Sequence, residues 1–331
     1  MSRAVALRLG AFAGALALAF GAAYGIGSAV DPIAAADDTS AAPAHGEEMG
    51  GMEQGSHGGH ESGGQLPGLA VSDAGYTFTP ATTFFTGKQK TELRFTIQGP
   101  DGKPVTKYTK THEKDLHLIA VRRDLSGFHH VHPTMAADGT WSIPFTFTAG
   151  GTWRLYADFQ PAGLDKNITL GTDVNVSGLY VPVPLNEPAA VTTTDGYDVT
   201  LAGTPVAGKE SELTFTVSKD GKPVANLQPY LGAFGHLVSL RSGDLAYLHN
   251  HPAQHAEANM VGGPTIKFMT TFPTAATYSL FLDFQHAGAV HTAEFTVKVG
   301  STGTTIVPPT TPPTAVPSHE EEAHEHEQPV R

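Results

Sequence analysis

The sequence contains no cysteine. This absence excludes disulfides, thiolate zinc sites, type 1 copper sites and lipid attachment at a lipobox cysteine. Imidazole and oxygen remain as metal ligands, and the 17 His and only six Met do not favour a dedicated Cu(I) carrier. Basic residues are also scarce, because 20 Lys and Arg against 32 Asp and Glu leave a net charge of −12. That balance argues against nucleic acid or an anionic membrane surface as a partner.

Helical periodicity is missing from residues 68–300. Short alternating apolar runs recur there at intervals of about 10 residues with turn signals between them, which is the pattern of an antiparallel β-sandwich. Trp153 and Tyr278 follow Gly-Thr and Ala-Thr steps and resemble the aromatic corner of immunoglobulin-like domains.

The pattern occurs twice, with a period of about 120 residues that fits a duplicated domain and is too long for a solenoid unit. Matching segments are 93–97 with 213–217, 101–104 with 220–223, and 153–160 with 278–285. We predict an all-β chain with two tandem immunoglobulin-like antiparallel β-sandwich domains. The predicted boundaries are a signal peptide or membrane anchor at 1–36, a disordered His-, Gly- and Met-rich spacer at 37–67, repeat 1 at 68–178, a Pro-rich linker at 179–188, repeat 2 at 189–300 and a disordered Pro/Thr-rich and His/Glu-rich tail at 301–331.

Each repeat contains a hairpin with His at both ends, from His117 to His132 and from His236 to His251, and the two copies align without a gap. In the second hairpin a two-residue Gly243-Asp244 loop suits a primed turn. Such a loop sets the first His of each hairpin opposite the last.

Side chains alternate along a strand, so three imidazoles of each hairpin share one face. They are His117, His130 and His132 in the first copy and His236, His249 and His251 in the second. Opposed Cβ atoms lie roughly 5 Å apart, which lets imidazoles reach one ion with bonds of about 2 Å. The arrangement resembles the three-His zinc site of carbonic anhydrase and predicts a copper or zinc ion. The alternative is packing, because apolar residues such as Ile119 and Val238 occupy the same faces.

Further polar residues extend this prediction. The second repeat adds His286 and His291 around a tight turn, which we expect to place them opposite each other as a further metal-ligand pair or a plain surface pair. Both repeats also contain Asp-Phe-Gln, beginning at Asp158 and Asp283. These side chains are candidates for supporting the metal ligands or for a fourth ligand. Solvated polar residues at a sheet edge are the alternative.

The N-terminal segment predicts export. Arg3 and Arg8 precede an uncharged run of 22 residues from Leu9 to Val30, long enough to cross a bilayer, while Ala34-Ala35-Ala36 suits signal-peptidase cleavage. We predict an extracytoplasmic protein, membrane-anchored or secreted, with the membrane as a partner if the segment is uncleaved. The His-bearing spacer and tail are interpreted as solvated chain or as weak metal-binding segments.

The full chain resembles a family of bacterial exported, His-rich tandem β-sandwich proteins. His-Val-His132-Pro133, His-Asn-His251-Pro252 and Leu-Phe-Leu-Asp-Phe-Gln285 carry the likeness. The resemblance implies copper or heavy-metal handling at the cell envelope. From the residues we expect a binding protein that captures Cu(II) or Zn(II), with a non-catalytic surface scaffold or adhesion protein as the alternative. A three-His metal enzyme is a further alternative, although the sequence contains no nucleophile motif, phosphate loop or paired carboxylates.

Overall fold

The computed structural model describes residues 66–308, all of which belong to a single compact unit. Every regular element in the described range is a β-strand, which confirms the predicted all-β class. None of these residues forms a helix that is long and apolar enough to cross a membrane. The predicted export segment at 1–36, almost all of the spacer at 37–67 and most of the tail at 301–331 lie outside the described residues.

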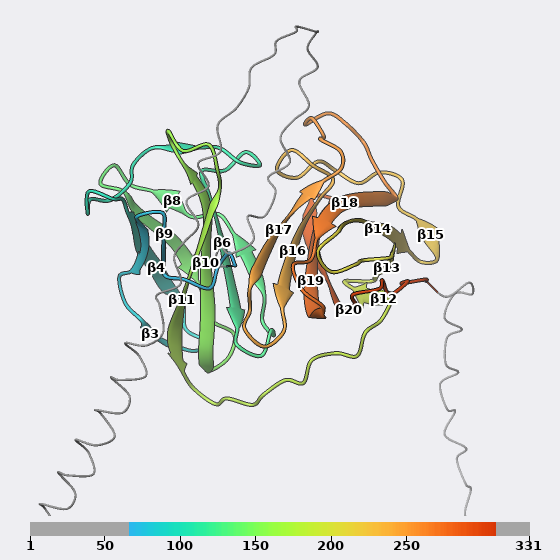
Figure 1. The fold of residues 1–331 in the computed structure, drawn as a ribbon, viewed down its shortest axis with the longest axis horizontal. Helices are drawn as coiled ribbons and strands as arrows, with labels where there is room; N and C mark the ends of the chain where they lie inside the picture. The colour runs from blue at the N-terminus through green and yellow to red at the C-terminus, as the bar shows by residue number, and fades with distance from the viewer. Residues whose placement is uncertain (1–65, 309–331) are drawn as a thin grey trace, which may run out of the picture. The chain divides into compact units, whose positions relative to one another are not determined.

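The first repeat is a sandwich of two sheets, ordered β1-β2-β4-β9-β8 and β3-β11-β10-β6-β7 (Figure 1). Its strands are β1 (Ser72–Asp73), β2 (Tyr76–Pro80), β3 (Phe84–Thr86), β4 (Thr91–Gln98), β5 (Tyr108–Thr109), β6 (Leu116–Arg122), β7 (His129–Val131), β8 (Thr134–Met135), β9 (Thr140–Phe145), β10 (Gly151–Pro161) and β11 (Ile168–Ser177). Named strands of this repeat pair antiparallel except β3, which runs parallel to β11. The chain leaves β7 in one sheet and enters β8 in the other through His132 and Pro133, where proline cannot donate to a ladder.

The second repeat follows the same order of elements. Its strands are β12 (Val191–Thr194), β13 (Tyr197–Gly203), β14 (Glu210–Lys219), β15 (Lys222–Pro223), β16 (Gly235–Arg241), β17 (Tyr247–Pro252), β18 (Thr265–Thr271), β19 (Ala276–His286) and β20 (Ala289–Val299). Here β17 pairs with β16 up to Asn250 and with β18 from His251 onward. One uninterrupted strand therefore joins the two layers of this sandwich at the place where the first repeat breaks into β7 and β8.

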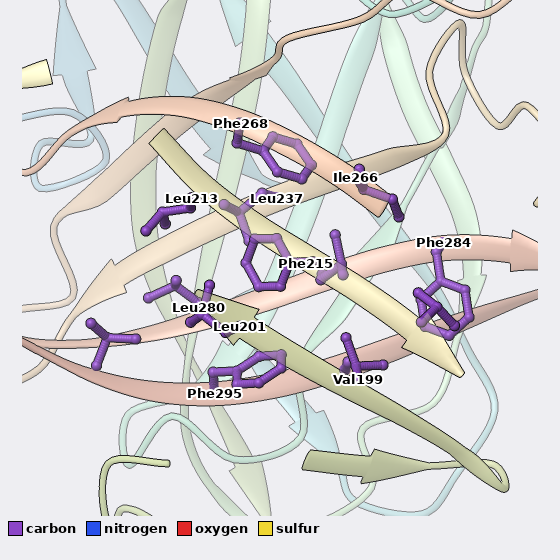
Figure 2. Packing of buried hydrophobic residues seen from close by; sticks show 14 of the residues in the cluster. Val199, Leu201, Leu213, Phe215, Leu237, Ile266, Phe268, Leu280, Phe284 and Phe295 are labelled. Atoms are coloured by element: carbon purple, nitrogen blue, oxygen red, sulfur yellow. The ribbon is translucent and has the colours of Figure 1, made fainter. Parts of the chain in front are cut away.

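Each repeat has its own apolar core, produced by the alternation of its strands. On β14, Leu213, Phe215 and Val217 are fully buried, while the residues between them are more exposed. Figure 2 shows Phe215 near Phe295 of β20, with ring centroids 5.5 Å apart. Full burial of a side chain of this size contributes roughly 1.5–3 kcal/mol, so these residues hold the two layers together.

The aromatic corner predicted from the sequence is present in both repeats. Trp153 Nε1 donates to the carbonyl oxygen of Ala149 at 3.0 Å, and the Tyr278 hydroxyl donates to that of Thr274 at 2.9 Å. In immunoglobulin-like sandwiches a strand-starting aromatic residue bonds back to the preceding chain in this way. The chain therefore contains two tandem immunoglobulin-like β-sandwiches.

A third apolar cluster lies between the two repeats. This cluster forms because β6 and β16 are buried on both faces. One face of each strand packs into the core of its own repeat. The other face, which bears His117 on β6 and His236 on β16, packs against the opposite repeat. Phe128 and Phe281 stack across this interface with ring centroids 4.0 Å apart. The cluster comprises Ile119, Val121, Leu125, Tyr156, Val238, Leu240, Leu245, Tyr247 and Phe281.

The turn of the second hairpin is wider than the predicted two-residue loop. Arg241 N donates to the carbonyl oxygen of Ala246, and the four residues between them form the loop. Leu245 adopts φ 63°, and the Asp244 carboxylate accepts hydrogen bonds from Arg241 and from the N–H of Ala246. An Asp side chain that bonds its own turn favours this longer loop. The wider loop has the same centre as the predicted one, so the strand register is unchanged.

The linker at 179–188 forms no strand, and it is attached to the first repeat. The Arg122 guanidinium donates to the carbonyl oxygen of Val181 at 3.0 Å. Val183 N donates to the Asp124 carboxylate at 2.9 Å. The chain between the repeats is therefore held by the turn of the first His hairpin.

Candidate metal centre

Three imidazole nitrogens converge in the first repeat. Ile119 of β6 pairs with His130 of β7, the register predicted from the sequence. His117 Nδ1 lies 3.0 Å from His130 Nε2 and 3.1 Å from His132 Nε2, and all three ligand atoms lie within 4.8 Å of one another. Zn–N bonds of about 2.0–2.1 Å place tetrahedral ligand nitrogens about 3.3 Å apart. The spacing of this His triad, His117, His130 and His132, therefore matches that of ligands around one small ion.

The outer nitrogens of two triad residues face acceptors. His117 Nε2 lies 2.9 Å from the carbonyl oxygen of Thr111, and His130 Nδ1 lies 2.8 Å from Oδ2 of Asp283. A carbonyl or a carboxylate accepts a hydrogen bond, so each outer nitrogen carries the proton and each inner nitrogen presents a lone pair. Two lone pairs 3.0 Å apart repel each other unless a cation lies between them. A shared metal ion or a shared proton supplies that cation.

His132 is held in its neutral form. Burial, together with the nearby imidazoles of His130 and His117, lowers the pKa of His132 to about 2. Neutral imidazole is the form that binds a metal ion, because protonation occupies the lone pair. The third member of the triad therefore needs no deprotonation before it acts as a ligand.

The Asp residues of the repeated Asp-Phe-Gln sequence are buried, so the alternative of solvated edge residues is wrong. Asp283 is 4% exposed and accepts a hydrogen bond from Thr292 Oγ1 at 2.6 Å. Asp158 is fully buried, and it accepts hydrogen bonds from Thr169 Oγ1 at 3.0 Å and from the Tyr247 hydroxyl of the second repeat at 3.3 Å. In both repeats this carboxylate reaches the opposite repeat, Asp283 at the His130 imidazole and Asp158 at the Tyr247 hydroxyl.

The second hairpin also has the predicted register, with Val238 paired to His249. His251 continues into the pairing with β18. The side chains of His249 and His251 lie outside the described part of the structure. Their metal-binding role therefore stays a prediction.

His236, the remaining member of the second set, lies beside the imidazoles of the first repeat. It is 6% exposed, and its Nε2 lies 2.7 Å from the carbonyl oxygen of Tyr230. Its ring centroid is 6.3 Å from that of His130 and 5.1 Å from that of His112. The His-bearing faces of the two hairpins therefore meet at the repeat interface.

The expected pairing of His286 with His291 is wrong. Ala287 and Gly288 form a tight turn in which His286 pairs with Ala289, so His291 falls opposite Phe284. Each imidazole has a local partner. His286 Nδ1 lies 2.7 Å from the Tyr197 hydroxyl, and His291 Nδ1 lies 2.8 Å from Oδ2 of Asp195. Among the described residues, the group suited to an ion contains neither of them.

His112 was missed by the sequence interpretation. It lies in a turn before β6, outside the hairpin, and its φ of 48° is unusual for a residue with a side chain. Its ring centroid lies 6.1 Å from His117 of its own repeat and 5.1 Å from His236 of the other. The only available sequence signal is its position five residues before His117, which alone indicates no contact.

The fold and this centre define a tandem immunoglobulin-like β-sandwich protein with a buried cluster of His at the contact between its repeats. The family model described as "Domain of unknown function (DUF8832)" matches residues 70–178 and 192–301. The chain therefore belongs to that family, with one copy of the domain in each repeat. No curated protein matches the chain.

Solved structures with similar parts include the Escherichia coli adhesin FdeC, at 18% identity and a TM-score of 0.22 over 70% of this chain and 65% of that one. E. coli alpha-2-macroglobulin activated by porcine elastase matches at 13% identity and a TM-score of 0.23, over 68% of this chain and 20% of that one. The D0-D1 domain of intimin matches at 12% identity and a TM-score of 0.20, over 67% and 97%. The chain thus spans less than two thirds of the first two proteins. Similarity at this level carries no argument about function.

Proposed function

We propose that the protein binds one Cu(II) or Zn(II) ion through His117, His130 and His132. The observation that carries this proposal is the convergence of three imidazole nitrogens, two of which have their outer N–H directed at Thr111 O and the Asp283 carboxylate. Histidine ligands in metal sites are typically oriented by such an outer acceptor, which also raises the basicity of the ligating nitrogen.

The donor set favours these two metals. Neutral imidazole suits Cu(II) and Zn(II), whereas Mg(II) and Ca(II) prefer oxygen ligands. The three described donors are all nitrogen. Three nitrogens within a few ångström of one another fit a tetrahedral zinc site with one further ligand, and Cu(II) fits if that position is completed in a tetragonal arrangement.

Binding is favoured over catalysis by the space beside the triad. The cavity that His117 and His130 line has a volume of about 20 Å³. A water molecule needs roughly 10–15 Å³ by this measure, so the cavity accommodates a water or a small ion but no organic substrate. The ion is therefore proposed as cargo or as a structural element of a binding protein.

Titration of the full-length chain with Zn(II) or Cu(II) against a weak competing chelator tests the proposal. We expect one tight class of site that H132N weakens at least tenfold, since Asn cannot replace the imidazole nitrogen. H255N is the matched control, because His255 is exposed and lies outside the triad. Unchanged tight binding in H132N would overturn the proposal. Replacement of the His in the terminal segments should lower total stoichiometry but keep the tight class, because preorganised ligands lose less conformational entropy on binding.

A second candidate is a non-catalytic scaffold or adhesion protein whose His serve in packing. It is favoured by the apolar cluster between the repeats, which joins two sandwiches through side chains such as Ile119, Val238 and Phe281. A proton shared by His117 and His130 would then replace the ion. The two candidates differ in metal content after stringent dialysis, because the scaffold retains none.

The cellular location is proposed from the sequence. Residues 1–36 suggest export and either retention as an anchor or cleavage. Fractionation of cells that carry a C-terminally tagged copy distinguishes these outcomes: membrane recovery supports the anchor, recovery in the medium supports secretion, and cytoplasmic recovery contradicts export.

A further inference from the structure

A cavity of about 500 Å³ lies at the end of the first repeat that bears the aromatic corner and the turn of the His hairpin. Sites for small organic molecules usually have volumes of about 300–1,000 Å³. Its wall includes Arg122, Lys88 and three apolar side chains of the linker, Leu179, Val181 and Val183. No residue of the triad lines it, so a site here is separate from the candidate metal centre.

Arg122 has an equivalent in the second repeat, Arg241. Each arginine pairs across its sheet with the aromatic corner residue of the same repeat, Arg122 with Trp153 and Arg241 with Tyr278. Each also donates from Nε and Nη2 to the carboxylate of an Asp in its own hairpin turn. The two arginines can therefore be compared at their remaining nitrogen, Nη1.

The Nη1 atoms of these two arginines differ in their partners. Arg241 Nη1 donates to Thr274 Oγ1 at 2.8 Å. Ala149 occupies the position of Thr274, because each of these residues accepts the hydrogen bond of its aromatic corner through its carbonyl oxygen. Alanine has no hydroxyl, so within residues 66–308 Arg122 donates from Nε and Nη2 only. Arg122 is 4% exposed, and an acceptor that enters the cavity would complete its hydrogen bonds.

The charges around the cavity favour an anionic acceptor. Lys88 adds a second cation to the wall, and no Asp or Glu is among the described residues that line it. The Asp124 carboxylate occupies the Nε–Nη2 edge of Arg122 and leaves Nη1 to another group. A carboxylate suits this position, because hydrogen bonds between two charged groups are roughly twice as strong as neutral ones.

The linker favours a ligand with an apolar part. Leu179, Val181 and Val183 are exposed apolar side chains, and all three line the cavity. Exposed apolar side chains that lie together often mark a binding site. A ligand that covers them would remove apolar area from water, which favours binding.

We infer that this cavity binds a small organic acid. Its carboxylate accepts a hydrogen bond from Arg122 Nη1 and lies on the wall that bears Lys88, and its apolar part packs against the linker. This inference goes beyond the proposed function, because the site shares no residue with the triad and requires no metal ion.

The test uses octanoate and its uncharged isostere octanamide as probes of the full-length chain, with binding measured by saturation-transfer NMR and calorimetric titration. We expect octanoate to bind at least about tenfold more tightly, because only the carboxylate forms a charge-assisted hydrogen bond with Arg122. Lys88→Gln should weaken octanoate binding by about two- to fivefold, as expected for an exposed charge. Lys90→Gln, at an exposed lysine outside the cavity, should leave it unchanged. Equal affinities for the two probes, or no binding of octanoate, would overturn the inference.

Ala149→Thr tests the role of Arg122 without removing it. The new hydroxyl should accept from Nη1, as Thr274 does in the second repeat, and weaken octanoate binding by about tenfold. Ala149→Val is the matched control, because valine has the shape of threonine but no hydroxyl, and it should weaken binding less. Equal losses in the two variants, or no loss in either, would overturn the assignment of Arg122. Circular dichroism establishes that each variant is folded, and the two probes with Lys88→Gln decide the matter if a variant at position 149 does not fold.

Discussion

His130 and Asp283 are 153 positions apart in the sequence, and they form a hydrogen bond across the repeat interface, with Nδ1 and Oδ2 2.8 Å apart. Both side chains are 5% exposed, so water competes little for this contact. The bond links a candidate metal ligand of the first repeat to a carboxylate of the second. A metal ion on the triad would therefore be coupled to the packing of the two sandwiches.

Replacement of Asp283 by Asn should weaken binding of Zn(II) to the triad by about 10- to 100-fold, the usual effect of removing a carboxylate that orients a histidine ligand. Competition titration of the full-length chain measures the change. Asp195→Asn is the control, because Asp195 makes the equivalent contact with His291, away from the triad. Equal affinities for the two variants would show that Asp283 does not orient a ligand.

Replacement of Phe281 by Ala should lower the free energy of unfolding by about 3–5 kcal/mol, as for other large-to-small changes at buried aromatic positions. Phe281 is 1% exposed and stacks on Phe128, so the loss falls on the contact between the repeats. Urea denaturation measures it. Phe84→Ala, at a residue that is 74% exposed, should change the value by no more than about 0.5 kcal/mol. Similar losses in both variants would contradict a specific role for the stacked pair.

Replacement of Gly68 by Ala should destabilise the protein by about 1–3 kcal/mol. Gly68 has φ 74°, and an added Cβ would lie 2.7 Å from the Tyr156 ring and 2.9 Å from Tyr247 Cβ, both of which are buried. Gly163→Ala is the control that separates backbone strain from steric overlap. Gly163 also has a positive φ, 89°, but no atom lies within 4 Å of the added carbon, so this variant carries the backbone strain alone. Thermal denaturation should therefore show a larger shift for the Gly68 variant. Equal shifts would mean that the space around Gly68 adapts.

Asp124 should contribute stability that is lost in acid. Burial alone would raise the pKa of its carboxyl, but hydrogen bonds from Arg122, Ser126 and the N–H of Val183 outweigh it and lower the pKa from 3.8 to about 2. The unfolded chain then binds more protons than the folded one between these values, so this contribution is present above about pH 4 and disappears as pH falls through about 2.

Urea unfolding of the wild type and Asp124→Asn at several pH values tests this expectation. The difference in unfolding free energy should be largest above about pH 4 and should shrink toward pH 2. Asp165→Asn, at an exposed loop position, serves as the reference for a surface change. A difference that does not vary with pH would contradict the assignment.

Much of the hairpin could be predicted from the sequence because its information is local. Side chains alternate faces with a period of two, so the loop centre determines which residues lie opposite each other. The register of Ile119 with His130 and of Val238 with His249 follows from that rule, even though the loop is wider than expected. The same rule failed for His291, because its turn is centred on Ala287 and Gly288, one residue before the centre that an opposed pair would need.

Only the tertiary structure determined which residues of the two repeats contact each other across the interface. The sequence established two immunoglobulin-like repeats and the His-bearing face of each hairpin, since alternation and duplication are visible along the chain. It contained no periodicity that relates Asp283 to His130 or His112 to His236, because these pairs form only when two separately folded sheets pack face to face. Burial of the apolar side chains on the outer faces of β6 and β16 drives that packing. The packing then determines which polar side chains of the two repeats come within hydrogen-bonding distance.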